Sequence, residues 1–364
     1  MANKTISQVE INGTTYDLLD ANTLSALSDL GDEIRDEIED AKKHLIVTIG
    51  DSWTQNANYW RNTYTSLYND EIRNYAQGGV GFIGTTQDNS NKFSVQLNTA
   101  INDATLDKNK VTHVLVMGGI NDYTYNYRDA GQFVSIIADM NASIEQNFPN
   151  ATPIFVVGNM NYHDYSAGLF SDQTVDATNV HQIYVWHQVK HLCAENGINV
   201  SCMYGWITRK EYKSDLIHPA ENGAGGNRIA ANIHALIHGG TLAYGAFITG
   251  RSTSTINNRC QLMIKEDEVQ LFNWCYVSQG AGIQYVTNPT SGFDGTEIPF
   301  NFIDTNNKGL SIPFKLSYPQ GGTCALGISH NRFAFFPFAP NKTVPEDQAG
   351  TYIVNAVVPI RTDY

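Results

Sequence analysis

Positive charge is scarce in this chain. Its 364 residues include 23 lysines and arginines against 36 aspartates and glutamates, which gives a formal net charge of −13. Nucleic acids and anionic membrane surfaces are held largely by clustered Lys and Arg, and the sequence contains no basic stripe of that kind. We therefore expect neither as a partner, and a neutral ligand such as a glycan fits the charge better.

Long hydrophobic runs and paired cysteines are missing as well. No apolar run approaches the roughly 18 residues of a membrane-spanning helix, and the N-terminus lacks the charged-then-apolar order of a signal peptide. We therefore expect no membrane insertion and no signal peptide. The five cysteines lie far apart with no CxxC pair. This spacing predicts reduced thiols in a core and no disulfide framework.

Residues 1–43 form the first of three predicted parts. VEINGTTYDLLD (9–20) places Asn-Gly between short alternating runs, which predicts a small hairpin. A short coiled coil is predicted after it, because apolar residues recur every three or four positions. These residues are Leu27, Leu30, Ile34, Ile38, Ala41 and Leu45. The coiled coil would make this part an attachment and oligomerisation segment, although a single amphipathic helix lying on its own domain explains the pattern almost as well.

Residues 44–242 alternate between strand and helix patterns. Apolar runs predict strands at 44–50, 71–76, 112–119, 152–160 and 198–204, with helical periodicities between and after them. This alternation predicts a parallel sheet covered by helices on both faces, and nearly continuous apolar strands fit such burial. Ligands bind beyond the carboxyl ends of the strands in these sheets, so the loops there are where chemistry is expected.

Residues 243–364 have a different character. Short β-type runs, separated by Gly, Pro and Asn, follow one another with no helical pattern between them. This pattern predicts an all-β sandwich or a small barrel. We expect its aromatic residues Trp274, Phe333, Phe335 and Phe336 to lie in the core.

Polar and glycine-rich motifs follow the predicted strands of residues 44–242. Gly-Asp-Ser ends at Ser52 after the first strand, NYAQGG ends at Gly79 after the second, and Asn121 follows the third. Asp215 and His218 stand three residues apart before the last helix. Each motif alone is ordinary turn sequence. Together they belong to one predicted rim of the sheet.

These residue types suit acyl transfer. A serine hydroxyl needs a base within hydrogen-bond reach, and the base needs a group that fixes its tautomer. Ser52, His218 and Asp215 supply these three groups. The negative tetrahedral intermediate needs N–H donors, and the candidates are the backbone N–H groups of Gly79 and Ser52 and the side-chain amide of Asn121.

The order of these motifs resembles a known family. GDS, Asn-x-Ala-x-x-Gly, Gly-x-Asn-Asp and Asp-x-x-His, in this order over residues 44–240, resemble the SGNH (GDSL-type) hydrolase superfamily. The resemblance implies a flavodoxin-like three-layer α/β/α fold and hydrolysis of esters, commonly acetyl esters on sugars, without metal or cofactor. It makes Ser52 the nucleophile, His218 the base, Asp215 its orienting acid, and Gly79 and Asn121 the oxyanion donors.

Residues beside these motifs are candidates for substrate binding. Trp53 stands where the family has a smaller aliphatic residue, so we expect it to narrow or reshape the acyl pocket. Ala76 stands where the family often has glycine, and it removes no catalytic group. Tyr- and Asn-rich loops could stack on a sugar, with ordinary loop packing as an equal alternative. The full set of candidates is Asp51, Trp53, Tyr125, Tyr162 and His163.

Two histidine pairs are candidate metal ligands. His187 and His191, and likewise His234 and His238, stand four residues apart on predicted helices, a spacing that can bind zinc. The sequence shows no matching third ligand for either pair. We therefore expect no metal and prefer solvated helix faces for these histidines.

The N-terminal segment carries a second, shorter resemblance. ISQVEINGTTYDLLDA (6–21) resembles the attachment segments of tail proteins from phages of low-GC Gram-positive bacteria. It implies a homotrimer in a virion, made in the host cytoplasm and joined to other tail proteins. The β domain would then bind glycan or support the trimer.

These observations combine into one functional expectation. We expect a serine esterase that removes ester groups, mainly O-acetyl, from a bacterial surface polysaccharide. Two alternatives stay open: a tail protein whose hydrolase-like domain only binds glycan, and a bacterial intracellular or non-classically exported esterase with the same chemistry but no tail.

Overall fold

The structure is a computed structural model. It describes residues 8–11, 14–17, 25, 29–31, 43–84, 91–124, 127, 129–159, 182–252, 256–277, 284–285, 324–329, 332–337 and 350–359. Among these residues no helix is both long enough and apolar enough to pass through a bilayer.

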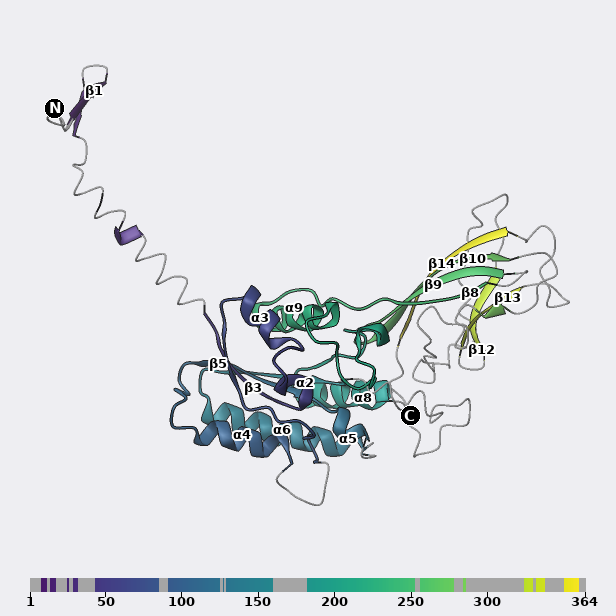
Figure 1. Cartoon of the computed structure of the whole chain (residues 1–364), viewed down its shortest axis with the longest axis horizontal. Coiled ribbons are helices and arrows are strands. Elements are labelled where there is room, and N and C mark those ends of the chain that lie inside the picture. Colours follow the sequence, from purple (N-terminus) through teal and green to yellow (C-terminus); the bar gives the residue numbers. More distant parts are fainter. Residues whose placement is uncertain are drawn as a thin grey trace.

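A five-stranded parallel sheet organises residues 44–242 (Figure 1). Its strands in chain order are β3 (Leu45–Gly50), β4 (Glu71–Asn74), β5 (Val111–Gly118), β6 (Thr152–Val157) and β7 (Val200–Cys202). In space the order is β4-β3-β5-β6-β7, with every neighbouring pair parallel. The predicted parallel sheet is therefore confirmed, at nearly the predicted positions.

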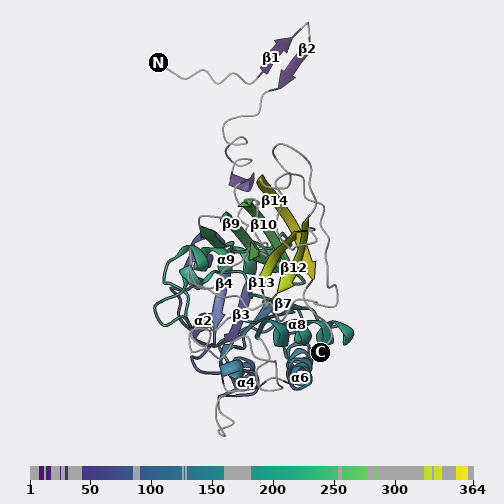
Figure 2. The same cartoon turned by 90° about the vertical axis from the view of Figure 1, so that its right-hand side faces the viewer.

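Helices cover both faces of this sheet (Figures 1 and 2). On one face lie α3 (Arg61–Leu67) and α9 (Ala224–His238), and on the other lie α4 (Phe93–Asn102), α6 (Ala130–Asn147) and α8 (Gln182–Glu195). The short helices α2 (Ser52–Gln55) and α5 (Ile120–Thr124) and the 3-10 helix η1 (Arg209–Glu211) lie in loops. In α6 the buried positions Phe133, Ile137, Met140 and Ile144 repeat every three or four residues, which is why this segment forms a helix with one buried face.

The strand order creates a natural site for ligands. From β3 the chain crosses to β4 on one side, whereas β5, β6 and β7 extend the sheet on the other side. The loops that leave β3 and β5 therefore diverge at the carboxyl ends of these strands, the switch point at which such sheets bind ligands. Gly50, the last residue of β3, stands there, with Ser52 two residues on.

Two glycines let the chain turn sharply at this rim. Gly119 follows β5 with φ +121°, and Gly158 follows β6 with φ +84°. A Cβ at Gly119 would lie 2.6 Å from the indole of Trp186, a fully buried residue of α8. Trp186 therefore packs directly against the backbone at two strand ends, and a larger residue at either glycine would displace the loops that follow.

The N-terminal part is described only in pieces. Strands β1 (Gln8–Ile11) and β2 (Thr14–Asp17) pair antiparallel, with Ile11 opposite Thr14, as expected for the predicted hairpin. Most of the coiled-coil stripe lies outside the described residues, so the coiled coil stays a prediction. Its last member, Leu45, was wrongly assigned, because Leu45 begins β3 and continues into the β-branched run that builds this strand.

The C-terminal part is all β in its described residues, as predicted. One antiparallel sheet has the order β14-β10-β9-β8, from β8 (Phe247–Ser252), β9 (Ile256–Ile264), β10 (Glu268–Val277) and β14 (Gly350–Pro359). A second has the order β11-β13-β12, from β11 (Gln284–Tyr285), β12 (Cys324–Ser329) and β13 (Arg332–Pro337). Packing of the two sheets into a sandwich, and the core positions of Trp274, Phe333, Phe335 and Phe336, stay predictions because these side chains lie outside the described part.

The turn between β9 and β10 is anchored on the α/β domain. Lys190 of α8 contacts Glu266 at 2.9 Å and Asp267 at 2.8 Å, and the Tyr204 hydroxyl donates to the Glu266 carbonyl. Beside this turn Ile264 and Val269 are buried in the core that α8 and β7 also line. This end of the first β sheet is thus fixed by both apolar and charged contacts.

Tight packing of α9 against the segment after α2 gives a testable expectation. A Cβ at Gly226 would overlap the carbonyl oxygen of Tyr59. We expect Gly226→Ala to lower the free energy of unfolding by about 1–3 kcal/mol, because overpacking outweighs the better helix propensity of alanine. Urea unfolding measures this, with Asn227→Ala at the exposed neighbouring position as control. Equal stability of the two variants would contradict the close contact.

Candidate functional site

Ser52, His218 and Asp215 form a hydrogen-bonded relay at the rim. The Oγ atom of Ser52 lies 2.9 Å from Nε2 of His218, and Nδ1 of His218 lies 2.8 Å from Oδ2 of Asp215. Ser52 begins α2 directly after β3, whereas the other two residues lie in the loop before α9. The structure therefore brings the three predicted residues together across 166 positions of sequence.

A tight turn holds the Asp215–His218 pair in shape. The second carboxylate oxygen of Asp215 accepts the backbone N–H groups of Ile217 at 2.9 Å and His218 at 3.0 Å. Burial works to raise the pKa of Asp215, but these two N–H groups and the His218 ring outweigh it and hold the pKa below its ordinary value. Asp215 is therefore an anion that can orient the imidazole and balance a charge on it.

Backbone strain is concentrated in the same turn. Leu216, between the two residues of the pair, has φ +57°, in the left-handed region that a branched side chain rarely adopts. Such a conformation costs on the order of 1–3 kcal/mol and persists where surrounding contacts impose it. The contacts here are the Asp215 carboxylate and the backbone bond from Lys213 N–H to the His218 carbonyl, at 2.8 Å.

Trp53 has a different place from the one predicted. Its side chain is only 1% exposed, so it does not line an open acyl pocket. Its indole N–H donates to the Ile217 carbonyl at 2.9 Å, and its ring packs edge-on against Tyr212. The expectation that Trp53 contacts substrate is thus wrong for this structure. The residue instead ties α2, which carries Ser52, to the loop that carries His218.

The prediction that Asp51 contacts substrate is also wrong, because Asp51 supports the site from inside the fold. Its carboxylate is fully buried, caps α2 by accepting the Trp53 N–H at 2.9 Å, and accepts the side-chain amide of Asn159 at 2.8 Å. Burial raises the pKa of Asp51 to about 7, with a further contribution from nearby Asp122, against these two hydrogen bonds. No substrate can reach this carboxylate, and its role is to fix the turn before Ser52.

Two amide side chains that we did not predict complete this support. Asn159, just after β6, accepts the Ile120 N–H at 2.8 Å while it donates to Asp51, so it joins the ends of three strands. Gln96 of α4 exchanges two hydrogen bonds with Gly50, at 2.9 and 3.0 Å. Asn159 lies inside the predicted strand 152–160, whereas the observed strand β6 ends at Val157, so a shorter strand would have placed Asn159 among the strand-end motifs. Gln96 is a helix residue without a sequence cue.

The predicted oxyanion donors lie on adjoining loops. The side-chain amide of Asn121 donates to the Val80 carbonyl at 2.9 Å, and it has a second hydrogen to donate. Gly79 has φ +75°, and no atom of the described residues lies within 4 Å of a Cβ placed on it. Nearby, Gly78 N–H donates to Gln55 of α2 at 2.9 Å. These contacts join the Gly79 loop to both Asn121 and the helix of Ser52.

Asp122 anchors the rest of that loop. Its buried carboxylate accepts the backbone N–H groups of Phe82 at 2.9 Å and Ile83 at 2.8 Å. Burial raises the pKa of Asp122 to about 6 against these hydrogen bonds. Asp122 thus positions the segment after Gly79, while its neighbour Asn121 faces the rim.

The remaining predicted residues separate into two groups. Tyr125, Tyr162 and His163 lie outside the described residues, so their substrate-binding roles stay predictions. His187, expected on a solvated helix face, is instead buried, at 1% exposed. Burial, together with neighbouring His191, lowers the pKa of His187 to about 3, so its ring is neutral.

Comparisons with known proteins give distant structural likenesses. No protein-family model matches the chain, and no curated protein matches it. A family two carbohydrate esterase from Clostridium thermocellum, solved with cellohexaose, is similar at 18% identity and a TM-score of 0.38, covering 54% of this chain and 65% of that one. A family 2 carbohydrate esterase from Corynascus thermopiles has 20% identity, a TM-score of 0.38 and coverage of 54% and 67%.

A third similar structure is the periplasmic domain of a lipopolysaccharide acetyltransferase from Salmonella ser. Paratyphi A. It has 15% identity and a TM-score of 0.38, and the match covers 54% of this chain and 84% of that one. These likenesses are too distant to assign an activity.

Burial of Asp51 predicts a pH effect on stability. Its pKa rises from 3.8 for an exposed carboxyl to about 7 in the fold. The folded chain therefore keeps this proton to higher pH than the unfolded chain. The stability contributed by the protonated Asp51 side chain is complete below pH 3.8 and is lost as pH rises through about 7. We expect the melting temperature of the wild type to fall relative to that of Asp51→Asn as pH rises.

Thermal unfolding of both proteins at a series of pH values measures this difference. Titrating groups that do not interact with Asp51 are common to the two chains and cancel in the comparison. A difference in melting temperature that stays constant with pH would contradict the raised pKa.

Proposed function

We propose that this chain is a serine esterase that removes O-acetyl groups from a bacterial surface polysaccharide. The observation that carries the proposal is the continuous relay Ser52–His218–Asp215, with contacts of 2.9 and 2.8 Å. These lengths are those of good hydrogen bonds, and the order hydroxyl, imidazole, carboxylate is the one that activates a serine.

The first half of the reaction follows from these contacts. Nε2 of His218 takes the hydroxyl proton of Ser52 as Oγ forms a bond to the ester carbonyl carbon. The imidazolium that forms is balanced by the Asp215 carboxylate on the other ring nitrogen. His218 then gives the proton to the leaving sugar oxygen, the C–O bond breaks, and the acyl group stays on Ser52.

The second half reverses these roles with water. His218 takes a proton from a water molecule as the water oxygen forms a bond to the acyl carbon. The bond between that carbon and Oγ of Ser52 then breaks, His218 returns the proton to Oγ, and the carboxylic acid leaves. In both halves the carbonyl oxygen becomes negative and needs fixed donors. The donors in this proposal are the Ser52 N–H, the Gly79 N–H and the second amide hydrogen of Asn121, which the adjoining loops bring near Ser52.

The substrate and the setting in this proposal rest on the charge of the chain and on two sequence resemblances. The net charge of −13 suits a neutral glycan, and the motif resemblance implies acetyl esters on sugars. The tail setting, the homotrimer and a place in a virion rest on the resemblance of residues 6–21 and stay part of the proposal.

Replacing the nucleophile tests the reaction directly. We expect Ser52→Ala to lower the turnover of p-nitrophenyl acetate, and acetate release from acetylated surface polysaccharide, at least about 1,000-fold, because no nucleophile remains. Ser66→Ala, which changes an exposed serine of α3, should keep full activity. A wild type that binds the polysaccharide but releases no acetate would instead support the binding-only alternative.

Trp53→Phe tests the link between α2 and the His218 loop. Phenylalanine keeps a buried ring but loses the N–H that bonds the Ile217 carbonyl. We expect kcat to fall roughly 10-fold with little change in KM, because the loop that presents His218 is released while substrate contacts remain.

Trp60→Phe is the matched control for this change. Trp60 is equally buried, and its indole N–H has no hydrogen-bond partner in the described part of the chain. An equal loss of kcat in both variants would show that ring size, and not the bond to Ile217, accounts for the effect.

A further inference from the structure

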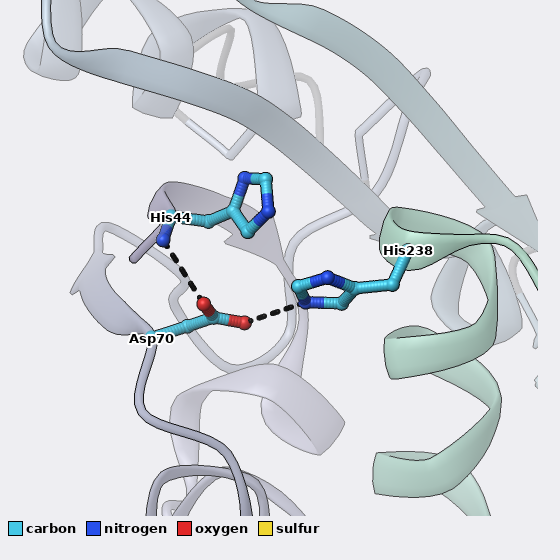
Figure 3. A group of neighbouring side chains, drawn as sticks. All are labelled: His44, Asp70 and His238. Atoms are coloured by element: carbon cyan, nitrogen blue, oxygen red, sulfur yellow. Dashed lines mark hydrogen bonds and ion pairs between the residues drawn. The ribbon is translucent and has the colours of Figure 1, made fainter. Parts of the chain in front are cut away.

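A second group of ionisable side chains lies at the opposite end of the sheet from Ser52. His44 stands just before β3, Asp70 just before β4, and His238 is the last residue of α9. Figure 3 shows the three side chains converging from these separate elements. The rings of His113 and His234 lie beside them, with centroids 4.9 Å from His44 and 4.1 Å from His238 respectively.

The potential ligand atoms in this group are close enough to share one ion. One ring nitrogen of His44, one of His238 and a carboxylate oxygen of Asp70 all lie within 4.8 Å of one another. Nε2 of His238 and Oδ2 of Asp70 are 3.0 Å apart. Ligands at about 2.0–2.2 Å from a tetrahedral zinc ion are roughly 3.3 Å from each other. Small side-chain movements would therefore complete the site.

Surrounding hydrogen bonds already orient two of these ligands. In the arrangement in which the Thr112 hydroxyl donates to the Leu45 carbonyl at 3.2 Å, its oxygen accepts from Nδ1 of His113 at 3.1 Å and from Nδ1 of His44 at 3.3 Å. This places the ring proton of His44 on Nδ1 and leaves the lone pair on Nε2. Metal-binding histidines characteristically donate their other nitrogen in this way.

Asp70 is fixed in the same manner. The Tyr64 hydroxyl donates to Oδ2 at 2.6 Å, and the backbone N–H of His44 donates to Oδ1 at 3.0 Å. The Asp70 side chain is only 4% exposed, and its ion-pair partner among the described residues is His238 itself. A buried carboxylate held by a hydroxyl and a backbone N–H is the support that metal ligands usually have.

We propose that His44, Asp70 and His238 bind one divalent zinc ion. Two imidazoles and a carboxylate form a donor set that zinc favours, with a fourth position for water. The other group within ligand range, His187, His191 and Asp267, is less suited. There the Lys190 ammonium contacts both Asp267 oxygens at 2.8 Å, so an ion would have to displace a positive charge.

The place of this site indicates a structural role. β3 runs from Leu45 to Gly50, so the ion would lie at one end of the strand and Ser52 at the other. It would join the first residues of the α/β domain to the end of α9, its last helix. Zinc should therefore raise thermal stability and leave ester hydrolysis below the melting temperature unchanged.

The test uses the full chain without a histidine tag, stripped with a chelator and then dialysed. Zinc is titrated against a chromophoric competitor, and cobalt is added separately for its visible absorption. We expect one ion per chain at micromolar or tighter affinity, a tetrahedral cobalt spectrum, and a melting temperature several degrees higher with zinc. His238→Ala should weaken zinc binding at least about 100-fold and abolish the cobalt spectrum.

His191→Ala is the matched control, because it removes an exposed histidine of the other group. It should leave zinc affinity and the cobalt spectrum unchanged. His238 is the last residue of α9 and its side chain is 29% accessible, so its replacement should leave the fold intact, as circular dichroism would verify. Absence of zinc binding to the wild type, full binding by His238→Ala, or loss of binding in His191→Ala would each overturn the proposal.

Discussion

The buried carboxylate of Asp51 is the constraint on which the geometry of the rim depends. It caps α2, and through Asn159 it is linked to the first residue of α5. The ends of β3, β5 and β6 are thereby held in one hydrogen-bonded network. Burying a carboxylate is costly unless its oxygens are hydrogen-bonded, and this cost is offset here by donors in the segments that follow β3 and β6. The result is a rigid base from which Ser52 faces the solvent-accessible His218.

A second set of contacts brings the partner loop to that base. The Asp215–His218 turn is strained at Leu216, and it is held from outside by the indole N–H of Trp53. Trp53 directly follows Ser52, and Ile217 directly precedes His218. The nucleophile and the base are therefore connected both by their own hydrogen bond and by the hydrogen bond from Trp53 to Ile217. Reactive groups need such support because a displacement of about 1 Å can cost a large factor in rate.

Much of the architecture follows from local sequence pattern. Apolar strands that alternate with helical periodicities predicted the parallel sheet, and the motifs after its strands predicted which loops would meet. The relay of Ser52, His218 and Asp215 could be foreseen because carboxyl ends of parallel strands share one edge. The coiled coil, the β sandwich and the roles of Tyr125, Tyr162 and His163 are not decided by the described residues and stay predictions.

Other features depended on contacts between distant residues. Trp53 was expected to face substrate, yet its ring turns inward, because the side chain's direction in the first turn of α2 is set by the packing of Tyr212 and Ile217. The histidine pairs lacked a third ligand in the sequence. Asp70, which reaches His238, is 168 residues away from it.

Local sequence pattern was enough to predict the succession of strands and helices along the chain and the residue types available at the rim. These depend on periodicity and turn chemistry within a few positions of the chain. The burial of particular polar side chains, the joining of loops and the convergence of a second cluster of ligands follow from the folded arrangement of the chain. The reason is physical: burial and hydrogen bonding of a side chain are set by whatever the folded backbone places around it, and those neighbours come from any part of the chain.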